Sequence, residues 1–164
     1  MRYLDHIKNL SELDGVYEML KETIMKHEFE GLSRQHILGY IRDIVENRSK
    51  DFFVVRNRHE EIKGIARSFQ YKPEDGHIEI GIFIDDELKE EKFDIMIEFL
   101  DYLFKDYPLR KVFCEQFQEE NDFFAIMDFE VEAILKEYVF YDGKYKDVVF
   151  WGMTREVFYE KTQL

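Results

Sequence analysis

Hydrophobic and polar positions alternate from His77 to Ile84, where every second residue is isoleucine. This period of two predicts a β-strand with at least one face in a core. An acidic hinge follows from Asp85 to Glu91. Apolar residues then recur at helical spacing from Phe93 to Tyr107, which predicts an amphipathic helix that ends before Pro108. A strand, a short acidic hinge and a helix therefore form the centre of the predicted fold.

The first fifty residues predict one short strand and two helices. Arg2 to Lys8 has the length of a short strand, and Ser11 is a suitable N-cap for a helix through residues 10–26. Gly31 ends that helix, and Ser33 begins a second one through residues 33–47. Both segments carry apolar side chains at helical spacing, which predicts one buried face for each.

Two further strands precede the central one. Residues 51–56 and 62–71 are rich in β-branched and aromatic residues, and short polar turns at 57–61 and 72–76 connect them to the strand from His77 to Ile84. Three consecutive strands with short turns predict an antiparallel meander from Asp51 to Ile84.

After Pro108, the pattern predicts a strand, a short helix and a hairpin. The strand at 109–118 follows the central helix, which predicts parallel pairing with the strand at 77–84. Residues 123–129 have room for about two helical turns. Two long strands, 131–139 and 144–153, flank a turn at 140–143, where Asp142 and Gly143 supply the positive φ angles of a tight hairpin. The fold class is therefore α/β (α+β), with a mixed central sheet flanked by helices.

Composition indicates one ordinary globular domain. The chain has 164 residues, of which 45% are hydrophobic and 36% charged, with no linker or internal repeat, so we expect a single domain over 1–164. The N-terminus lacks an apolar signal region and no apolar run approaches the roughly 18 residues that span a bilayer, so we expect a cytoplasmic protein without membrane contact. The single cysteine, Cys114, lies in an alternating apolar segment and is expected to be a buried structural thiol.

The net charge of −13 is spread along the chain. Nucleic acid is therefore an unsuitable partner, because phosphate binding requires clustered Lys and Arg. A cationic small molecule would be attracted electrostatically. The alternative is that the acidic residues only keep the protein soluble.

The element order and the C-terminal half resemble the GNAT N-acetyltransferases, in particular the branch of ribosomal-protein-alanine and spermidine acetyltransferases. The motifs that match are the central strand, a Glu-Asn pair, an aromatic residue before the penultimate strand and the final hairpin. The residues are Glu79, Gly81, Ile82, Glu120, Asn121, Phe129, Phe140, Asp142, Gly143, Tyr145 and Asp147. The resemblance covers about residues 51–158 and implies a GNAT-type fold.

The resemblance also implies acetyl-CoA as the acyl donor. In the family, the pantetheine arm pairs with the backbone of the central strand and the pyrophosphate lies at the start of the following helix. The corresponding cofactor-binding residues here are Ile82, Phe83, Ile84, Lys89, Glu90, Glu91, Lys92, Phe93 and Asn121.

The family acetylates amines with the help of a proton acceptor and often a tyrosine acid. Glu79 is the candidate acceptor by its place on the central strand, although an ordinary exposed strand residue would look the same. The family's tyrosine is missing, and Tyr138 is the first candidate to replace it, with Tyr141 and Tyr145 as further options. The acceptor substrate would be a small-molecule amine, such as a polyamine or an amino-sugar, or a protein N-terminus. The oligomeric state stays open, with a homodimer among the options.

Three departures from the family affect the donor site. The pyrophosphate loop has no glycine, and Glu90, Glu91 and Asp94 would repel a phosphate there while only two lysines offset them. The segment after Asn121 is about one helical turn short, and Asp128 stands where the family has glycine. Two hypotheses therefore remain: an acetyl-CoA-dependent N-acetyltransferase, or a catalytically degenerate GNAT-like binding protein that does not use acetyl-CoA.

A metal site has little support in the sequence. The five histidines show no metal-ligand spacing. The carboxylates between Asp85 and Glu91 have suitable oxygen ligands for a divalent cation, but a solvated acidic helix start has the same composition. We therefore predict no metal centre.

Overall fold

The computed structural model describes residues 2–21, 33–46, 52–118 and 123–163. The chain divides into two compact units: the first comprises Met1–Arg67 and Gly81–Phe99, and the second comprises Ser68–Ile80 and Leu100–Leu164. The prediction of a single domain over 1–164 is not tested by this division and stays a prediction.

Strands β1 (Leu4–Asp5), β2 (Phe52–Arg56), β3 (Ile62–Lys72) and β4 (His77–Ile84) come first in the sheet. β5 (Lys111–Phe117), β6 (Glu130–Tyr141) and β7 (Lys144–Thr154) complete it. Their hydrogen-bonded order is β1-β2-β3-β4-β5-β7-β6.

The pairing confirms the predicted topology. β2 pairs antiparallel with β3, and β3 is the neighbour of β4 across a turn in which Gly76 N–H donates to the carbonyl of Lys72 at 2.9 Å. β4 and β5 pair in parallel, as the intervening helix predicted. At the tip of the β6–β7 hairpin, Asp142 and Gly143 have φ angles of 52° and 75°, the left-handed values that the Asp-Gly pair predicted.

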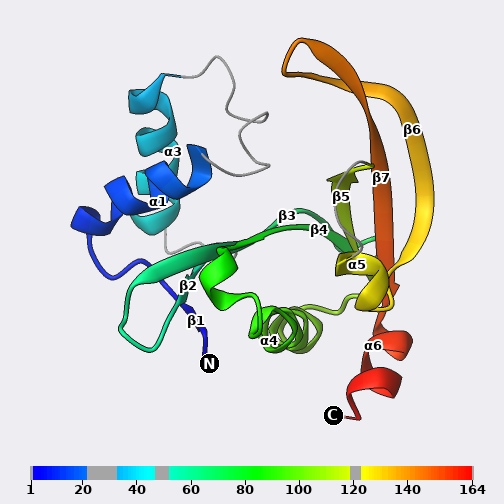
Figure 1. Ribbon diagram of the computed structural model, residues 1–164. Helices are drawn as coiled ribbons and strands as arrows, with labels where there is room; N and C mark the ends of the chain where they lie inside the picture. The colour runs from blue at the N-terminus through cyan, green and yellow to red at the C-terminus, as the bar shows by residue number, and fades with distance from the viewer. Residues whose placement is uncertain (1, 22–32, 47–51, 119–122, 164) are drawn as a thin grey trace. The chain divides into compact units, whose positions relative to one another are not determined.

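In the first unit, the sheet is covered by α1 (Leu13–Lys21) and α3 (Arg34–Glu46) on one face (Figure 1). Their apolar side chains form a core with alternate residues of β2 and β3. The buried members are Leu13, Val16, Ile37, Ile41, Phe52, Val54 and Ile65. Phe53, which alternates with these residues, contacts Phe99 of α4 (Lys92–Asp106) with ring centroids 6.1 Å apart. The first half of α4 therefore packs on the other face of this unit's strands.

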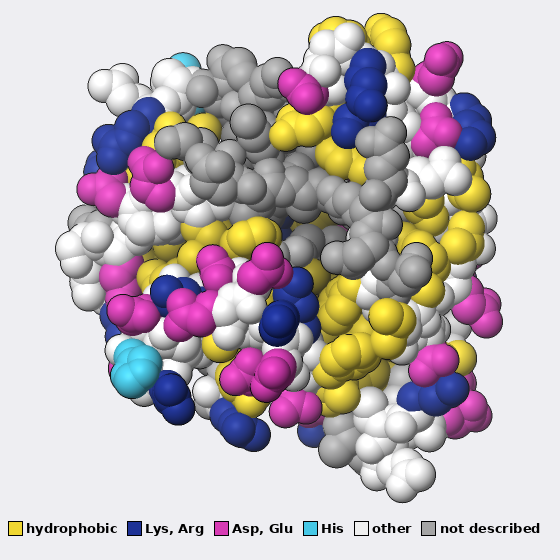
Figure 2. All heavy atoms as spheres, in the orientation of Figure 1, with side chains coloured by type: hydrophobic (Ala, Val, Ile, Leu, Met, Phe, Trp, Pro, Cys, Tyr) yellow, Lys and Arg dark blue, Asp and Glu magenta, His cyan; other side chains and the backbone are white. Residues whose placement is uncertain are grey.

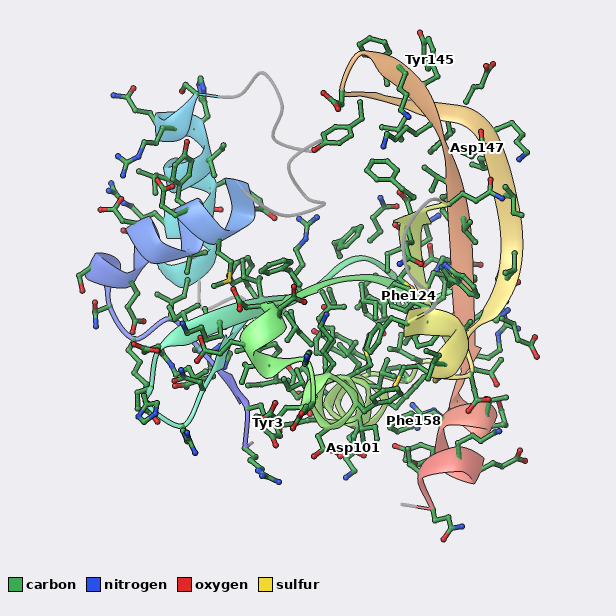
Figure 3. All side chains as sticks on the ribbon, viewed as in Figure 1. Tyr3, Asp101, Phe124, Tyr145, Asp147 and Phe158 are labelled. Atoms are coloured by element: carbon green, nitrogen blue, oxygen red, sulfur yellow. The ribbon has the colours of Figure 1, made fainter. Side chains whose placement is uncertain are left out.

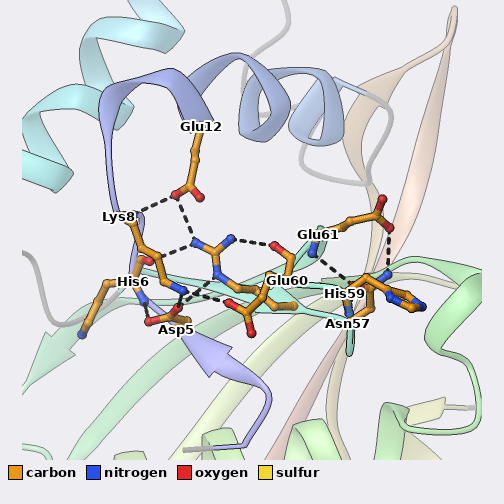
Figure 4. Close-up of polar contacts among 9 residues, drawn as sticks. Asp5, His6, Lys8, Glu12, Asn57, His59, Glu60 and Glu61 are labelled. Carbon is orange, nitrogen blue, oxygen red and sulfur yellow. Dashed lines mark hydrogen bonds and ion pairs between the residues drawn. The ribbon is translucent and has the colours of Figure 1, made fainter.

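A buried arginine, Arg56, joins the elements of the first unit through Asp5 and Glu12, which are labelled in Figure 4. Arg56 is only 7% exposed, and its guanidinium donates to the carboxylates of Asp5 at 3.0 Å and Glu12 at 3.0 Å. Burial alone would raise the pKa of both carboxyl groups. Hydrogen bonds outweigh burial and lower the pKa of each: at Asp5 they come from Lys8 first, then from the N–H of His6 and from Arg56, and at Glu12 from Arg56 first and then from the N–H of Lys8. This arrangement fixes β1 and the start of α1 to β2.

The second unit also contains α5 (Phe123–Ile126) and α6 (Arg155–Thr162). Phe104, from the second half of α4, packs against Phe158 of α6 with centroids 5.3 Å apart. The guanidinium of Arg155 donates to the carbonyls of Tyr107 and Leu109 at 2.9 and 2.7 Å, which fixes α6 to the end of α4.

The β6–β7 hairpin is long and carries several exposed apolar side chains (Figures 1 and 2). Tyr138, Phe140 and Tyr145 are 55%, 58% and 64% exposed. Asp147 lies on β7 (Figure 3) and accepts hydrogen bonds from Lys136 Nζ and from the N–H of Glu137. These bonds bridge a register irregularity between Leu135 and Val139.

Two details differ from the sequence-based expectations. Ser11 does not cap the first helix: it lies inside a 3₁₀ turn, Leu10–Glu12, where its N–H donates to the side chain of Asn9 at 3.0 Å. The first helix is described only to Lys21, and the rest of the segment predicted as helical, residues 22–26, lies outside the described residues. α6 was not predicted, although Thr154 is a proper N-cap that accepts from Val157 N–H.

Within the part of the chain that the structure describes, no helix is both long enough and apolar enough to cross a membrane.

Candidate functional site

Glu79 lies on the half-buried face of β4. Its neighbours Ile78 and Ile80 are 0% and 2% exposed, so alternation puts Glu79 and His77 on the opposite side of the strand. In the parallel ladder, Glu79 is opposite Phe113 and His77 is opposite Lys111.

The pairing continues this face across the second unit. Phe113 is opposite Gly152 of β7, and Glu115 is opposite Phe150. We call this surface the Glu79 face; its members are His77, Glu79, Lys111, Phe113, Glu115, Phe150 and Gly152. The ring of His77 meets the ring of Phe113 edge-on, with centroids 5.3 Å apart and planes at 88°. An aromatic floor with carboxylate and ammonium groups around it is a suitable surface for an organic cation.

Tyr138 is on the same side of the sheet but not beside Glu79. Its ring lies 6.3 Å from that of Phe150, a member of the Glu79 face. Tyr138 is on β6, and the strand order places β5 and β7 between β6 and β4. Three strand spacings of about 4.8 Å separate the two backbones by roughly 14 Å. The structure therefore does not bring the two candidate catalytic residues together, and the role of Tyr138 stays a prediction.

The C-terminal half of β4 extends beyond its ladder with β5. That ladder comprises four pairs, from His77 with Lys111 to Ile80 with Cys114, while β4 continues to Ile84. On the β3 side, the Phe83 carbonyl is so close to Gly64 that a Cβ there would lie 2.5 Å from it. A strand forms backbone hydrogen bonds along two edges. Along the β5 edge, residues 81–84 lie beyond the ladder, and their backbone groups on that edge could pair with an extended ligand.

The segment between β4 and α4 is tightly turned. Asp85 caps the 3₁₀ turn Asp86–Leu88 by accepting from Glu87 N–H at 2.8 Å. The carbonyl of Glu91 then accepts from Ile95 N–H at 3.0 Å, so Glu91 occupies the N-cap position of α4. Of the predicted pyrophosphate residues, Lys89, Glu90 and Phe93 are exposed, whereas Glu91 and Lys92 are half-buried. A helix start of this form has N–H donors for an anion.

The side chains at this helix start are mainly acidic. Glu87 is bound by Lys63 Nζ at 2.7 Å and by Asn57 at 3.2 Å, and these hydrogen bonds, that of Lys63 first, lower its pKa. Within the described residues, Glu90, Glu91 and Asp94 have no ion-pair partner. Lys92 makes one contact of 3.8 Å, to Asp86. The carboxylates near the first turn therefore outnumber the cations.

The region after β5 explains one departure from the family pattern. Asn121 lies outside the described residues, and α5 contains no tyrosine. Asp128 has a φ of 63°, a left-handed value that glycine adopts most readily and aspartate tolerates. Its carboxylate accepts from Lys161 Nζ at 3.2 Å. The substitution at this position is therefore accommodated by the backbone.

Cys114 is buried, as predicted. Burial raises the pKa of its thiol well above the ordinary value, so the thiol is protonated at neutral pH. It is therefore not a nucleophile. No group of three or more His, Cys, Asp or Glu side chains among the described residues is placed to hold a metal ion.

Sequence reasoning missed Lys111, Glu132 and Gly152. Lys111 Nζ lies 2.5 Å from Glu132 Oε1 and 5.3 Å from the centroid of Phe113. Contacts between β5 and β6 depend on the strand order and on a bulge, and neither has a clear sequence signal. The one available sign was Gly152, because a glycine inside a predicted strand often marks a place where another group approaches the backbone closely.

No family model matches the chain. None of the curated proteins matches it either. Among solved structures, spermidine N-acetyltransferase from Vibrio cholerae in complex with CoA and spermine is similar, with a TM-score of 0.80 and 20% identity over 94% of this chain and 96% of that chain. A dodecameric structure of the same enzyme in an intermediate state gives a TM-score of 0.79 and 19% identity, with 99% of each chain covered. At these identities the similarity concerns the fold, which is the GNAT fold that the element order predicted.

Proposed function

We propose that this chain, which has the GNAT fold, is an N-acetyltransferase that transfers an acetyl group from acetyl-CoA to an amine. The observation that carries the proposal is the parallel ladder of β4 and β5, which stops after Ile80 while β4 continues to Ile84. The similar Vibrio cholerae enzyme was solved with CoA and spermine, and that similarity supports the same donor here.

In this proposal the donor's pantetheine arm pairs with the backbone of residues 81–84. Ile82, Phe83 and Ile84 supply the N–H and carbonyl groups, and the segment from Lys89 to Phe93 faces the pyrophosphate. The fit is good along the strand and poor at the phosphates, because Glu90 and Glu91 have no cationic partner among the described residues. We therefore expect acetyl-CoA to bind through its pantetheine arm, with little contribution from its pyrophosphate.

The proposed acceptor is a small cationic amine. Two features support it: the net charge of −13, and the aromatic and acidic groups on the Glu79 face. The similar enzymes carry spermidine in their names, which makes a polyamine the first candidate. A protein N-terminus is the other acceptor to test.

Glu79 is the proposed proton acceptor. An ammonium substrate must lose a proton before its nitrogen can attack, and a nearby carboxylate both attracts the cation and accepts that proton. The nitrogen then forms a bond to the acetyl carbon while the bond from that carbon to sulfur breaks. The departing thiolate takes a proton from solvent or from an acid, a role for which Tyr138 remains the candidate.

The test is calorimetric titration of the full chain with acetyl-CoA, followed by mass spectrometry of a mixture of acetyl-CoA with spermidine, spermine or an N-terminal peptide. A micromolar dissociation constant together with an acetylated amine supports the proposal. Glu79→Gln is the matched variant, since it keeps the side-chain shape and removes the base.

The absence of heat at millimolar acetyl-CoA would overturn the proposal. The carboxylates at the start of α4, which have no cationic partner among the residues that the structure describes, favour the second candidate, a GNAT-like binding protein that does not use acetyl-CoA. In that case the chain would bind a polyamine without acetylating it.

A further inference from the structure

An ion pair on the Glu79 face connects two strands that are not neighbours. Lys111 on β5 and Glu132 on β6 are joined at 2.5 Å, although β7 lies between their strands. The Lys111 side chain is largely shielded, at 17% exposed, and that of Glu132 is partly shielded, at 33%. The ammonium also lies 5.3 Å from the centroid of the Phe113 ring. Because the ammonium is largely removed from solvent, this pair is screened less than one between two fully exposed side chains.

The backbone is shaped to allow this contact. The register of β6 against β7 shifts between Val131 and Ala133, so Glu132 occupies a bulge. A bulge redirects a side chain, and here it sends Glu132 across β7. At the crossing point β7 has Gly152, where a Cβ would lie 2.5 Å from Glu132 Oε1 and 2.8 Å from its Cγ. A side chain at 152 would therefore require Glu132 to move.

Lys111 has a second carboxylate within reach. Lys111 on β5 is opposite His77 on β4. Glu79 is two residues after His77 on β4 and lies on the same face. Two residues of rise and one strand spacing put their Cα atoms about 8 Å apart. A lysine and a glutamate side chain together span that distance, so diagonal pairs of this kind form readily.

We infer that Glu132 is a positioning residue: it holds the Lys111 ammonium over Phe113 and keeps it from taking the place of the substrate ammonium beside Glu79. The inference rests on the proposed function, in which Glu79 accepts the amine proton. Without Glu132, Lys111 is a tethered cation next to Glu79 and competes with the substrate at a high effective concentration.

A purely structural role for the pair makes a different prediction. If the bond only fastens β6 to β5, loss of either partner harms the protein and loss of both harms it as much. If Glu132 restrains Lys111, the loss of Glu132 is harmful only while Lys111 is present. The two roles are therefore separated by a second substitution at Lys111.

The experiment compares Glu132→Met, Lys111→Met, the double variant and a matched control, Glu160→Met. Methionine is unbranched and follows the path of either side chain without charge. Glu160 is an exposed carboxylate on α6, so its variant has the same net charge as Glu132→Met. Steady-state kinetics with acetyl-CoA and a polyamine are measured for each, and crystal structures are determined for wild type and Glu132→Met.

We expect Glu132→Met to lower kcat/KM for the amine by at least about tenfold, part of the 10²–10⁴ that a positioned base supplies. The amine KM should rise, while the acetyl-CoA dissociation constant stays as in wild type. The double variant should recover most of the lost kcat/KM, and Glu160→Met should match wild type. A Glu132→Met variant with normal kinetics, or a loss that Lys111→Met does not rescue, would overturn the inference.

The crystal structure gives a result that does not depend on activity. In Glu132→Met, Lys111 Nζ should move to within ion-pair distance of Glu79, about 4 Å. An ammonium that stays over Phe113 or turns to solvent would refute the restraint. If wild type makes no acetylated amine, the proposed function fails, and this structure still decides whether Glu132 holds Lys111 away from Glu79.

Discussion

Removal of two negative charges at the start of α4 is expected to tighten acetyl-CoA binding. The perturbation is Glu90→Gln with Glu91→Gln, which removes the charge and keeps the side-chain length. Glu91 caps α4 through its carbonyl, so the backbone hydrogen bond to Ile95 N–H is retained. The helix start then has its N–H donors and its lysines without the two carboxylates that precede Phe93.

The size of the effect follows from distance and exposure. Carboxylates next to the first helical turn lie on the order of 6 Å from a phosphate bound there. In a solvent-exposed setting the repulsion at this distance is about 0.7 kcal/mol per charge pair, or about 1.4 kcal/mol for two. That corresponds to roughly tenfold in the dissociation constant. A more buried phosphate would experience a larger effect.

Calorimetry at low and at physiological salt measures this effect. The gain should be greatest at about 0.01 M ionic strength and smaller at about 0.15 M, where the screening length is about 8 Å. A matched variant, Glu156→Gln with Glu160→Gln, removes the same charge from α6 and controls for net charge. An unchanged dissociation constant at low salt, with the fold intact by circular dichroism, would show that charge does not limit binding here.

Three further results are expected. Glu79→Gln should lower kcat by about 10²–10⁴ and leave the acetyl-CoA dissociation constant unchanged; a variant with wild-type kcat would return Glu79 to an ordinary strand residue. Arg56→Met should cost about 2–4 kcal/mol of unfolding free energy at pH 7, measured by denaturant titration. The pKa values of its two carboxylate partners are lowered in the folded state. Their contribution is therefore fully present above the ordinary values of 3.8 and 4.5, and it is lost as pH falls below these values and through the lowered folded-state ones. The cost should therefore be smaller at pH 3 than at pH 7, and a pH-independent cost would contradict this. Gly64→Ala should lower the melting temperature by several degrees, because a Cβ would lie 2.5 Å from the Phe83 carbonyl and 3.0 Å from Val55 Cβ; an unaltered melting temperature would show that β3 and β4 separate easily.

The elements that the sequence predicted well are those in which one periodicity extends over many residues. β4 shows a period of two and α4 shows helical spacing over four turns, and both appear where expected. α6 was missed because it is short and its polar residues outnumber its apolar ones, so its cap at Thr154 was the only signal. The assignment of Ser11 as a cap was wrong. The side chain that accepts a backbone hydrogen bond in this turn is that of Asn9, two residues earlier, and the donor is the N–H of Ser11 itself.

The candidate site was only partly predictable, because alternation along one strand does not show which residues of other strands lie beside it. Alternation places Glu79 on the side of β4 opposite Ile78 and Ile80, since a strand has only two faces. The neighbours of that face belong to other strands, and their identity depends on register. The sequence contained no sign that a bulge would send Glu132 across Gly152 to Lys111. Asn121 lies outside the described residues, so its predicted role beside the donor remains a prediction.

The interleaving of the two compact units has a consequence for the history of the chain. β3 leaves the first unit after Arg67, and β4 returns to it at Gly81; α4 leaves it again after Phe99. Neither unit is therefore a continuous piece of polypeptide. A single recombination event at any gene position between codons 68 and 99 would divide at least one unit. A truncation after Phe99 would keep the first unit whole, but it would also carry Ser68–Ile80 of the second unit without the rest of that unit. Exchange of one unit between two such chains would therefore require two crossovers, one on each side of the returning segment.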